Sequence, residues 1–379
     1  MITDLLRLQL DDLKQQGLYR SRSIVDERVT GVNFSSNDYL SLRNDANVRR
    51  AFERGFAKYP AGSGASMVVC GYHAIHQELE QTFAKLLGVD DALLFNSGYA
   101  ANLGVVALLA RLNCHLLIDK AAHASVYDGI KLVNATYSRF LHNNLVDLSQ
   151  KIEAHSSAQA LLTESIFSMS GQQPDLIEIT NLCQAYKTAC IVDEAHAFGV
   201  LGPHGLGAVA QNELNQEDIP IRIITFGKAM GSQGAIIAGR ADWIEGLFQT
   251  ARAHLYSTAM SPAIAYGLLE SLSIVIEADD ERQKLHHLIV YFQQAIKKSP
   301  LCWRNSHSPI QQLQLGCPHK ALQYAAYLKK QGINCLPMRE PTVCLRETGL
   351  RVVLNAHHEP QDIDNLFKHL HQLTYESKH

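Results

Sequence analysis

The chain has 379 residues, 46% of them apolar, and is long enough for a large hydrophobic core and for two or three domains. Its formal net charge of -3 argues against nucleic acid or an anionic membrane as a partner, and no apolar run is long enough to span a membrane. Eight scattered cysteines without a C-x-x-C pair and an acidic N-terminus predict a cytoplasmic protein with no disulfide framework, metal site or targeting peptide.

The first predicted element is an amphipathic helix. Thr3 suits its N-cap position, and Gly17 is typical of a residue that ends a helix. In chain order we expect a helix over 3–16, a short strand and turn over 32–42, a glycine–serine loop over 61–66 with no helix directly after it, and a helix over 74–87.

Short apolar runs then alternate with helical patterns. Helices are expected over 98–110 and 176–187, and strands over 92–96, 115–119, 161–164, 189–193, 221–226 and 234–239. This alternation is typical of parallel strands joined by crossover helices. We therefore predict an α/β fold whose largely parallel sheet has helices on both faces.

The C-terminal part has a different pattern. A long helix over 262–298 is followed by strands over 311–315, 333–337 and 350–354 and by helices over 319–331 and 360–374. This order predicts a small α+β domain. We divide the chain into an N-terminal segment of residues 1–45, a large α/β domain of residues 46–275 and a small C-terminal domain of residues 276–379.

Two of the predicted strands end at residues that can do chemistry. One run reads Ile-Val-Asp193-Glu194-Ala195-His196, and the other reads Ile-Ile-Thr225-Phe-Gly-Lys228. In a parallel sheet both ends lie at the carboxyl edge, where open α/β folds bind ligands. An acid, a histidine and a lysine at one edge suit pyridoxal phosphate, because the acid keeps the pyridine nitrogen protonated and the lysine forms a Schiff base.

The same tetrapeptide, Asp-Glu-Ala-His, also occurs in nucleic-acid-dependent ATPases. Those enzymes need a phosphate loop, G-x-x-x-x-G-K-S/T, before the acidic motif. The Gly227-Lys228 pair lies after it, is followed by Ala229, and has Arg222 in place of the first glycine. The sequence therefore argues against a DEAH-type ATPase.

Further motifs, in this order and spacing, resemble the α-oxoamine synthases of the fold-type-I pyridoxal phosphate enzymes, and the resemblance covers nearly the whole chain. The matching stretches are Phe34–Leu40, Gly71-Tyr72, His76-Gln77, Ser97–Asn102, His123–Ser125, His142-Asn143, Glu164–Gly171, Val192–His196, Thr225–Lys228, Tyr256–Thr258 and Pro341–Val343.

The resemblance implies a large domain with a mostly parallel seven-stranded sheet, a small α+β domain, and a homodimer with shared active sites. It also implies an acyltransferase that condenses L-alanine with a pimeloyl thioester, carried by coenzyme A or acyl carrier protein, in biotin biosynthesis. Ala65 and Met67 depart from the family pattern. Glycine C-acetyltransferase, or another member with a different amino acid and thioester, stays an alternative. A regulator that binds ligand without turnover usually carries a basic DNA-binding domain, which this chain lacks.

By resemblance, five residues interact with the ring of the cofactor. Lys228 forms the Schiff base and removes the α-proton, and Asp193 pairs with the ring nitrogen. His196 and Ser168 hydrogen-bond the phenolic oxygen, and His123 stacks on the ring and helps to position the substrate. A structural histidine at position 123 or 196 and an N-cap at Asp193 are the alternatives. We expect Glu194 to support the site from behind or to lie at the surface, and not to act as a catalyst.

The cofactor phosphate has its own candidates. Gly98 and Tyr99 open a helix after a strand, so their free amides form an anion site, although a plain helix cap explains them too. Thr225 adds a hydroxyl. By resemblance, Ser257 and Thr258 reach the phosphate of the other subunit.

Substrate-binding residues are likewise carried over by resemblance. Arg351 matches the arginine that holds the amino-acid carboxylate, unless it is an ordinary edge-strand arginine. Asn37 helps to hold the same substrate, and Thr342 contacts the acyl substrate. Arg20 and Arg22 compete for a place near the acyl chain, and we rank Arg20 first.

Overall fold

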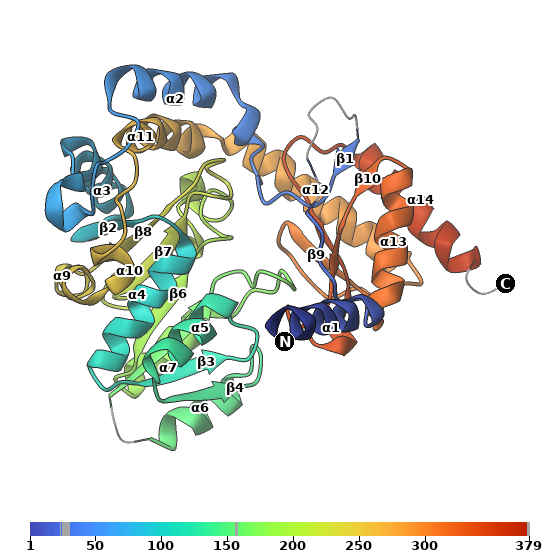
Figure 1. Cartoon of the computed structure of the whole chain (residues 1–379), viewed down its shortest axis with the longest axis horizontal. Coiled ribbons are helices and arrows are strands. Elements are labelled where there is room, and N and C mark those ends of the chain that lie inside the picture. The colour runs from blue at the N-terminus through green and yellow to red at the C-terminus, as the bar shows by residue number, and fades with distance from the viewer. Residues whose placement is uncertain (23, 25–30, 156–157, 377–379) are drawn as a thin grey trace. The chain divides into compact units, whose positions relative to one another are not determined.

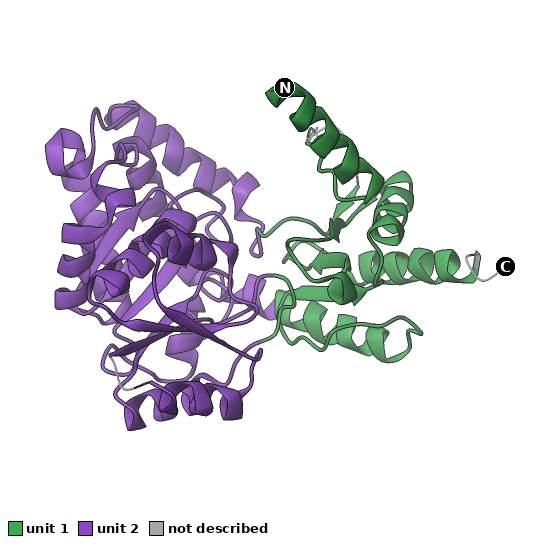
Figure 2. Ribbon diagram, turned by 60° about the horizontal axis from the view of Figure 1, so that its bottom comes forward, with its two compact units in different colours: residues 1–37, 169–172, 284–379 green, residues 38–168, 173–283 purple. Residues whose placement is uncertain are grey.

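The computed structural model describes residues 1–22, 24, 31–155 and 158–376, which form two compact units (Figures 1 and 2). Unit 1 comprises residues 1–37, 169–172 and 284–379, and unit 2 comprises residues 38–168 and 173–283. The units therefore interleave along the sequence. The division into three segments that the sequence suggested stays a prediction about domains.

Unit 2 contains a seven-stranded sheet in the described part of the chain. Its spatial order is β2 (Asp91–Phe95), β8 (Ala235–Gly239), β7 (Ile221–Thr225), β6 (Ala189–Asp193), β5 (Gln159–Glu164), β3 (His115–Asp119) and β4 (Tyr137–Phe140). Strand β8 pairs antiparallel with both neighbours, and the other pairings are parallel. This confirms the predicted, mostly parallel sheet and the α/β fold class.

Helices cover both faces of this sheet (Figure 1). Apolar side chains of one face, such as Leu162, Ile191 and Ile223, form a core with helices α4 (Gly98–Arg111), α5 (Ala124–Val133) and α9 (Ala241–Thr250). Helices α3 (Ala74–Leu87), α6 (Leu145–Glu153) and α7 (Leu176–Ala185) also pack on strands of the sheet. The remaining helices of unit 2 are α2 (Ala46–Lys58), α8 (Ala208–Gln211), α10 (Arg252–Leu255) and α11 (Pro262–Glu277).

Unit 1 is a smaller α+β body. Its antiparallel sheet has the order β11 (Leu336–Met338), β12 (Gly349–Val353) and β9 (Ile310–Gln314), and β1 (Val32–Asn33) pairs in parallel with β10 (Ile333–Asn334). Helix α13 (Pro318–Lys330) packs on β10, β11, β12 and α14 (Pro360–Glu376). The rings of Phe292, Trp303 and Phe367 contact one another in its core.

The prediction of one long helix over 262–298 is wrong. Two helices occupy this range, α11 and α12 (Asp279–Lys297), with Ala278 between them. Arg282 donates to the carbonyl oxygens of Val275 and Ile276, 2.5 and 2.7 Å away, and so satisfies the end of α11. The acids Asp279, Asp280 and Glu281 favour the start of a new helix through its dipole.

Four smaller predictions are also corrected. The strand over 333–337 is split into β10 and β11, because each half pairs with a different strand. The strand over 32–42 is limited to β1. Helix α1 (Ile2–Gln15) begins after Met1, not at Thr3. A π-helical turn, Met67–Gly71, directly follows the loop where no helix was expected. Among the described residues, no helix combines the length and the apolar character needed to cross a membrane.

Candidate active site

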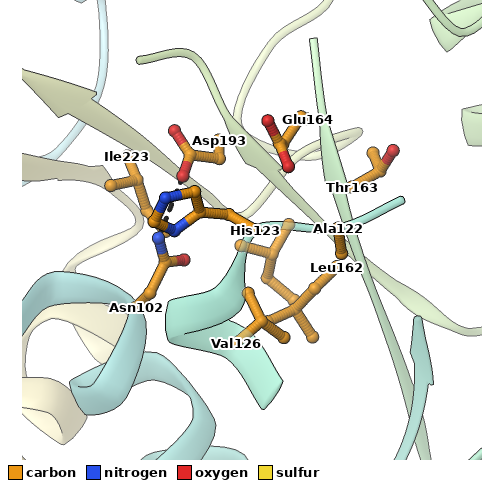
Figure 3. Close-up of a pocket in the computed structure, with 10 residues that line it drawn as sticks. Asn102, Ala122, His123, Val126, Leu162, Thr163, Glu164, Asp193 and Ile223 are labelled. Atoms are coloured by element: carbon orange, nitrogen blue, oxygen red, sulfur yellow. Dashed lines mark hydrogen bonds between the residues drawn. The ribbon is translucent and has the colours of Figure 1, made fainter. Parts of the chain in front are cut away.

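The carboxyl edge of the unit 2 sheet gathers polar residues from three neighbouring strands. Glu164 ends β5, Asp193 ends β6 and Thr225 ends β7. Glu164 and Asp193 are register partners across the β5–β6 ladder. A cavity of about 10 Å³, near the smallest volume that holds one water, is lined by His123, Glu164, Asp193 and Asn102 together with apolar side chains (Figure 3).

Asp193 is held by two hydrogen bonds. Asn102 of α4 donates its Nδ2–H to Asp193 Oδ2 at 2.9 Å, drawn as a dashed line in Figure 3, and the backbone N–H of Ala195 donates to Oδ1 at 2.9 Å. Both bonds fix the orientation of the carboxylate. The residue is half-buried. It can therefore present a negative charge to a ligand at the sheet edge.

His123 lies directly before helix α5 and caps it. Its ring nitrogen Nδ1 lies 2.8 Å from the hydroxyl of Ser125 and accepts from the backbone N–H of Ser125 at 3.3 Å. Burial of the ring is the main cause that lowers the pKa of His123, and the positive charge of Lys228 lowers it too. The carboxylate of Asp193 has the opposite effect and raises this pKa. The imidazole is therefore neutral at pH 7 and suits stacking on a flat ring.

Lys228 follows β7 and is half-buried. Its charge acts on His123 and also on Glu164, whose pKa it lowers. Lys228, Asp193 and His123 therefore lie close enough for their charges to interact, although the three residues are far apart in the sequence. The structure brings these three candidates together.

His196 is buried, and its Nδ1 lies 2.5 Å from the hydroxyl of Tyr39. Ser168 is also buried, and its backbone N–H donates to Glu164 Oε2 at 3.0 Å. Both residues belong to unit 2, as do Lys228, Asp193 and His123. The contact of His196 with Tyr39 is one that the sequence did not indicate.

The start of helix α4 forms the predicted anion site. Ser97 caps the helix by accepting from the N–H of Ala100 at 3.1 Å, and Gly98 is its first residue. A Cβ at Gly98 would collide with Thr225 Cγ2, so glycine permits the close approach of the helix to β7. Thr225 Oγ1 is buried and has no hydrogen-bond partner among the described residues. Tyr99, by contrast, donates its hydroxyl to Asp128.

These observations fit pyridoxal phosphate. A phosphate needs free amides, a helix N-terminus and hydroxyls, and Gly98, Tyr99 and the unpartnered hydroxyl of Thr225 supply them. A pyridine nitrogen needs a fixed carboxylate, and an aldehyde needs an amine. Asp193 and Lys228 supply these two groups at the same sheet edge.

Ser257 and Thr258 lie next to the end of β2. Asn96 donates its Nδ2–H to Ser257 Oγ at 3.0 Å and to the carbonyl oxygen of Thr258 at 2.6 Å. Within one chain they therefore contact the residue before Ser97. Their contribution to a partner's phosphate site stays a prediction.

The predicted substrate residues lie in unit 1. Arg351 of β12 is buried and donates to Asn37 Oδ1 at 2.9 Å. Arg20 donates to Thr342 Oγ1 at 2.9 Å, so these candidates form two pairs. Arg22, the rival of Arg20, is exposed. Their roles toward substrate stay predictions.

Two residues of this region, Glu164 and Asn102, were not assigned a role from the sequence. Glu164 ends an apolar strand in the same way as Asp193, and Asn102 is a polar residue in an otherwise apolar helix, so a signal for both existed. Glu194 was expected behind the site or at the surface. It is 0% exposed and pairs with Arg222 at 3.2 Å, so the surface interpretation is wrong.

Comparison with known proteins adds independent information. Residues 29–370 match the family described as aminotransferase class I and II. A protein of Marinobacter nauticus named 8-amino-7-oxononanoate synthase is 36% identical over 372 residues, 96% of this chain and 94% of that protein.

Two solved structures are also similar. The 8-amino-7-oxononanoate synthase of Francisella tularensis has a TM-score of 0.81 at 30% identity, covering 93% of this chain and 100% of that chain. A serine palmitoyltransferase of S. paucimobilis with bound PLP has a TM-score of 0.89 at 24% identity, covering 97% of this chain and 96% of that one. The second likeness shows the fold alone.

Proposed function

Because this chain belongs to the class I and II aminotransferase family and is a fold-type-I, pyridoxal phosphate-dependent acyltransferase, we propose that it makes 8-amino-7-oxononanoate for biotin biosynthesis. The substrates are L-alanine and a pimeloyl thioester, and the products are the amino-ketone, CO2 and the free thiol. One observation carries the assignment of the chemistry to this site. Asp193, at the end of β6, lines one cavity with His123, and Lys228 follows β7, the strand that pairs with β6.

The reaction forms one carbon–carbon bond and breaks three bonds, namely the Cα–H and Cα–carboxylate bonds of alanine and the C–S bond of the thioester. The α-carbon of alanine loses its proton and attacks the thioester carbonyl, and the thiolate leaves and takes up a proton. The carboxylate then leaves as CO2, and a proton returns to the α-carbon. Pyridoxal phosphate, when bound, withdraws electron density from the α-carbon through both steps.

The residues of unit 2 hold the cofactor and move the proton. The amine of Lys228 is the covalent attachment point, and, once the substrate amine has displaced it, it accepts the α-proton. Asp193, oriented by Asn102 and Ala195, holds a proton on the ring nitrogen. The neutral imidazole of His123 would contact the ring, and the N-terminus of α4 would bind the phosphate.

We propose that Arg351 binds the carboxylate of the amino-acid substrate. Its burial and its hydrogen bond to Asn37 support this role. We also propose that Arg20 and Thr342, which form a hydrogen bond with each other, contact the acyl chain of the thioester. We also propose a cytoplasmic homodimer. Two apolar side chains, Val68 and Val69, are exposed and could be covered by a second subunit. They follow the Ser63–Ala65 segment, which forms hydrogen bonds with Ala259, the residue after Thr258.

The test is a comparison of substrates on the purified, cofactor-loaded protein. Alanine or glycine is combined with pimeloyl-coenzyme A or acetyl-coenzyme A, and thiol release and CO2 are measured. We expect alanine with the pimeloyl thioester to react at least about tenfold faster than any other pair. A faster reaction of glycine with the acetyl thioester would replace the proposal with glycine C-acetyltransferase.

Lys228 is tested in the same assay. Lys228→Ala should abolish turnover and also the borohydride-reducible adduct at position 228. Lys85→Ala, at an exposed position on α3, is the matched control and should leave both unchanged. Normal turnover by Lys228→Ala would refute the assignment of this lysine.

A further inference from the structure

Glu164 is the buried acid of this site that the proposed chemistry does not use. It is 5% exposed and stands opposite Asp193 in the β5–β6 ladder, so two carboxyl groups lie side by side at the sheet edge. Both line the cavity beside His123 (Figure 3). Two like charges in such a position repel each other, and burial disfavours both. One of them must therefore lose its charge unless a cation compensates.

The contacts of the two acids differ in a way that selects the neutral one. Asp193 accepts from a side-chain amide and a backbone amide. Glu164 Oε2 accepts from the N–H of Ser168, whereas Oε1 is buried without a hydrogen bond of ordinary geometry among the described residues. A buried, unpartnered carboxylate oxygen is costly, whereas a protonated one is much less so.

The electrostatics agree with this geometry. Burial is the main cause that raises the pKa of Glu164, to about 8, and the nearby Asp193 raises it too, whereas Lys228 and the backbone N–H groups of Ser168 and His123 lower it. These are the charged and titratable groups that face Glu164 from β6, from the segment after β7 and from the start of α5. At pH 7 the carboxyl group is therefore mostly protonated.

The neighbours of Glu164 indicate what it does. The N–H of Ser168 donates to its Oε2, and His123 lines the same cavity, where its N–H lowers the pKa of the carboxyl group. These are the residues assigned to the phenolic oxygen and to one face of the cofactor ring. We propose that Glu164 is a positioning residue that acts as an uncharged carboxyl group, holding the backbone of Ser168 through its Oε2, packing beside His123 and leaving the negative charge at the ring to Asp193.

This inference rests on the proposed function for its meaning, but its test does not depend on the choice of substrate. Glu164→Gln keeps the shape and neutrality of a protonated glutamate, and its amide oxygen can accept from Ser168. Glu164→Ala removes both contacts. Glu78→Gln, at an exposed position on α3, is the matched control.

The first readout is cofactor binding, followed by the absorbance of the bound cofactor. We expect the Gln variant to bind pyridoxal phosphate within about twofold of the parent protein. The Ala variant should bind at least about tenfold more weakly, because the buried N–H of Ser168 loses its partner and the space beside His123 is left empty. Equal, severe weakening in both variants would overturn the proposal, since only a charged glutamate would then serve.

The second readout is thermal unfolding of the full-length, cofactor-loaded protein between pH 5 and pH 9. A raised folded-state pKa means that the unfolded state releases the proton first, so the parent protein loses stability as pH rises from about 4.5 to about 8. The amide side chain in E164Q cannot ionise, so the stability of this variant relative to the parent should rise across this window. A constant difference would overturn the neutral-acid assignment.

The two failures can be told apart. If the parent protein forms no borohydride-reducible adduct with pyridoxal phosphate, the proposed function fails, whatever the unfolding curves show. If it forms the adduct and E164Q nevertheless binds as weakly as E164A, only the role of Glu164 fails.

Discussion

Two buried glutamates near the carboxyl edge of the same sheet, Glu164 and Glu194, have opposite surroundings. Glu194 is fully buried, but Arg222 lies 3.2 Å away and the N–H of Val209 donates to Oε1 at 2.9 Å. Arg222 in turn donates to the carbonyl oxygen of Leu87. Glu164, by contrast, lies beside a second acid, which raises its pKa instead of lowering it.

The difference separates a structural acid from one that belongs to a site. Burial raises the pKa of both glutamates, and in Glu194 the Arg222 guanidinium opposes the rise. The Glu194–Arg222 pair joins the segment after β6 to β7 and presents no charge to a ligand. The cluster of Glu164, Asp193, His123 and Lys228 gathers four titratable groups at one sheet edge, and burial and charged neighbours shift the pKa values of Glu164 and His123, which is typical of functional sites.

The largest effect should come from Asp193 in this cluster of titratable groups. Asp193→Asn keeps the shape of the side chain but cannot hold a proton on the ring nitrogen. We expect turnover to fall by about 10³-fold, while the free energy of unfolding changes by less than about 1 kcal/mol. Steady-state kinetics and urea unfolding check this. Near-normal turnover would show that the carboxylate is structural, as Glu194 is.

The opposite result is expected for Arg222. Arg222→Met leaves Glu194 buried without its cation, so the free energy of unfolding should fall by about 3–5 kcal/mol, with unchanged turnover per folded molecule. Urea unfolding measures this. Arg240→Met, which removes a surface pair with Glu217, is the control and should cost less than about 1 kcal/mol. If both variants lost the same free energy of unfolding, the buried Glu194–Arg222 pair would contribute no more to stability than a surface pair.

A third buried acid sharpens the comparison through pH. Glu80 accepts from the hydroxyl of Tyr72 at 2.6 Å and from the N–H of Leu94 at 2.8 Å, and burial raises its pKa to about 7. The unfolded state therefore ionises first, and stability is lost as pH rises from about 4.5 through about 7.

Replacing Glu80 with Gln should remove this dependence. We expect the stability difference between Glu80→Gln and the parent to shift by on the order of 2 kcal/mol in favour of the variant between pH 5 and pH 8. Unfolding at several pH values measures it. A pH-independent difference would show that Glu80 is already charged at pH 5.

The smallest effect is expected for Asn102. Asn102→Ala removes the amide that orients Asp193 Oδ2, so turnover should fall by about tenfold, the factor that corresponds to one hydrogen bond to a charged group. The substrate KM should hardly change, because Asn102 acts through Asp193. A change in KM alone would point to a direct contact with substrate instead.

Much of the sheet edge could be predicted from local patterns. The apolar run that stops at Asp193 predicted a strand over 189–193, and β6 ends there. The next run predicted a strand over 221–226, and β7 ends one residue earlier, at Thr225. The start of helix α4 at Gly98 was predicted too. These features depend on neighbouring residues only, which is why they can be read without a structure.

Other features depend on contacts between distant residues. Nothing local shows that Arg222, 28 residues after Glu194, would reach it, or that Tyr39 would contact His196. The break at Ala278 was missed because the apolar pattern continues through it, and the capping by Arg282 comes from the side chain of the next helix.

By itself, the sequence determined the α/β class, the strand ends that bear chemistry and, through ordered motifs, the cofactor. Only the tertiary structure decided that β5 lies beside β6, and so placed Glu164 next to Asp193. Strand order is set by the packing of whole faces of the sheet, a property that no short stretch of residues contains.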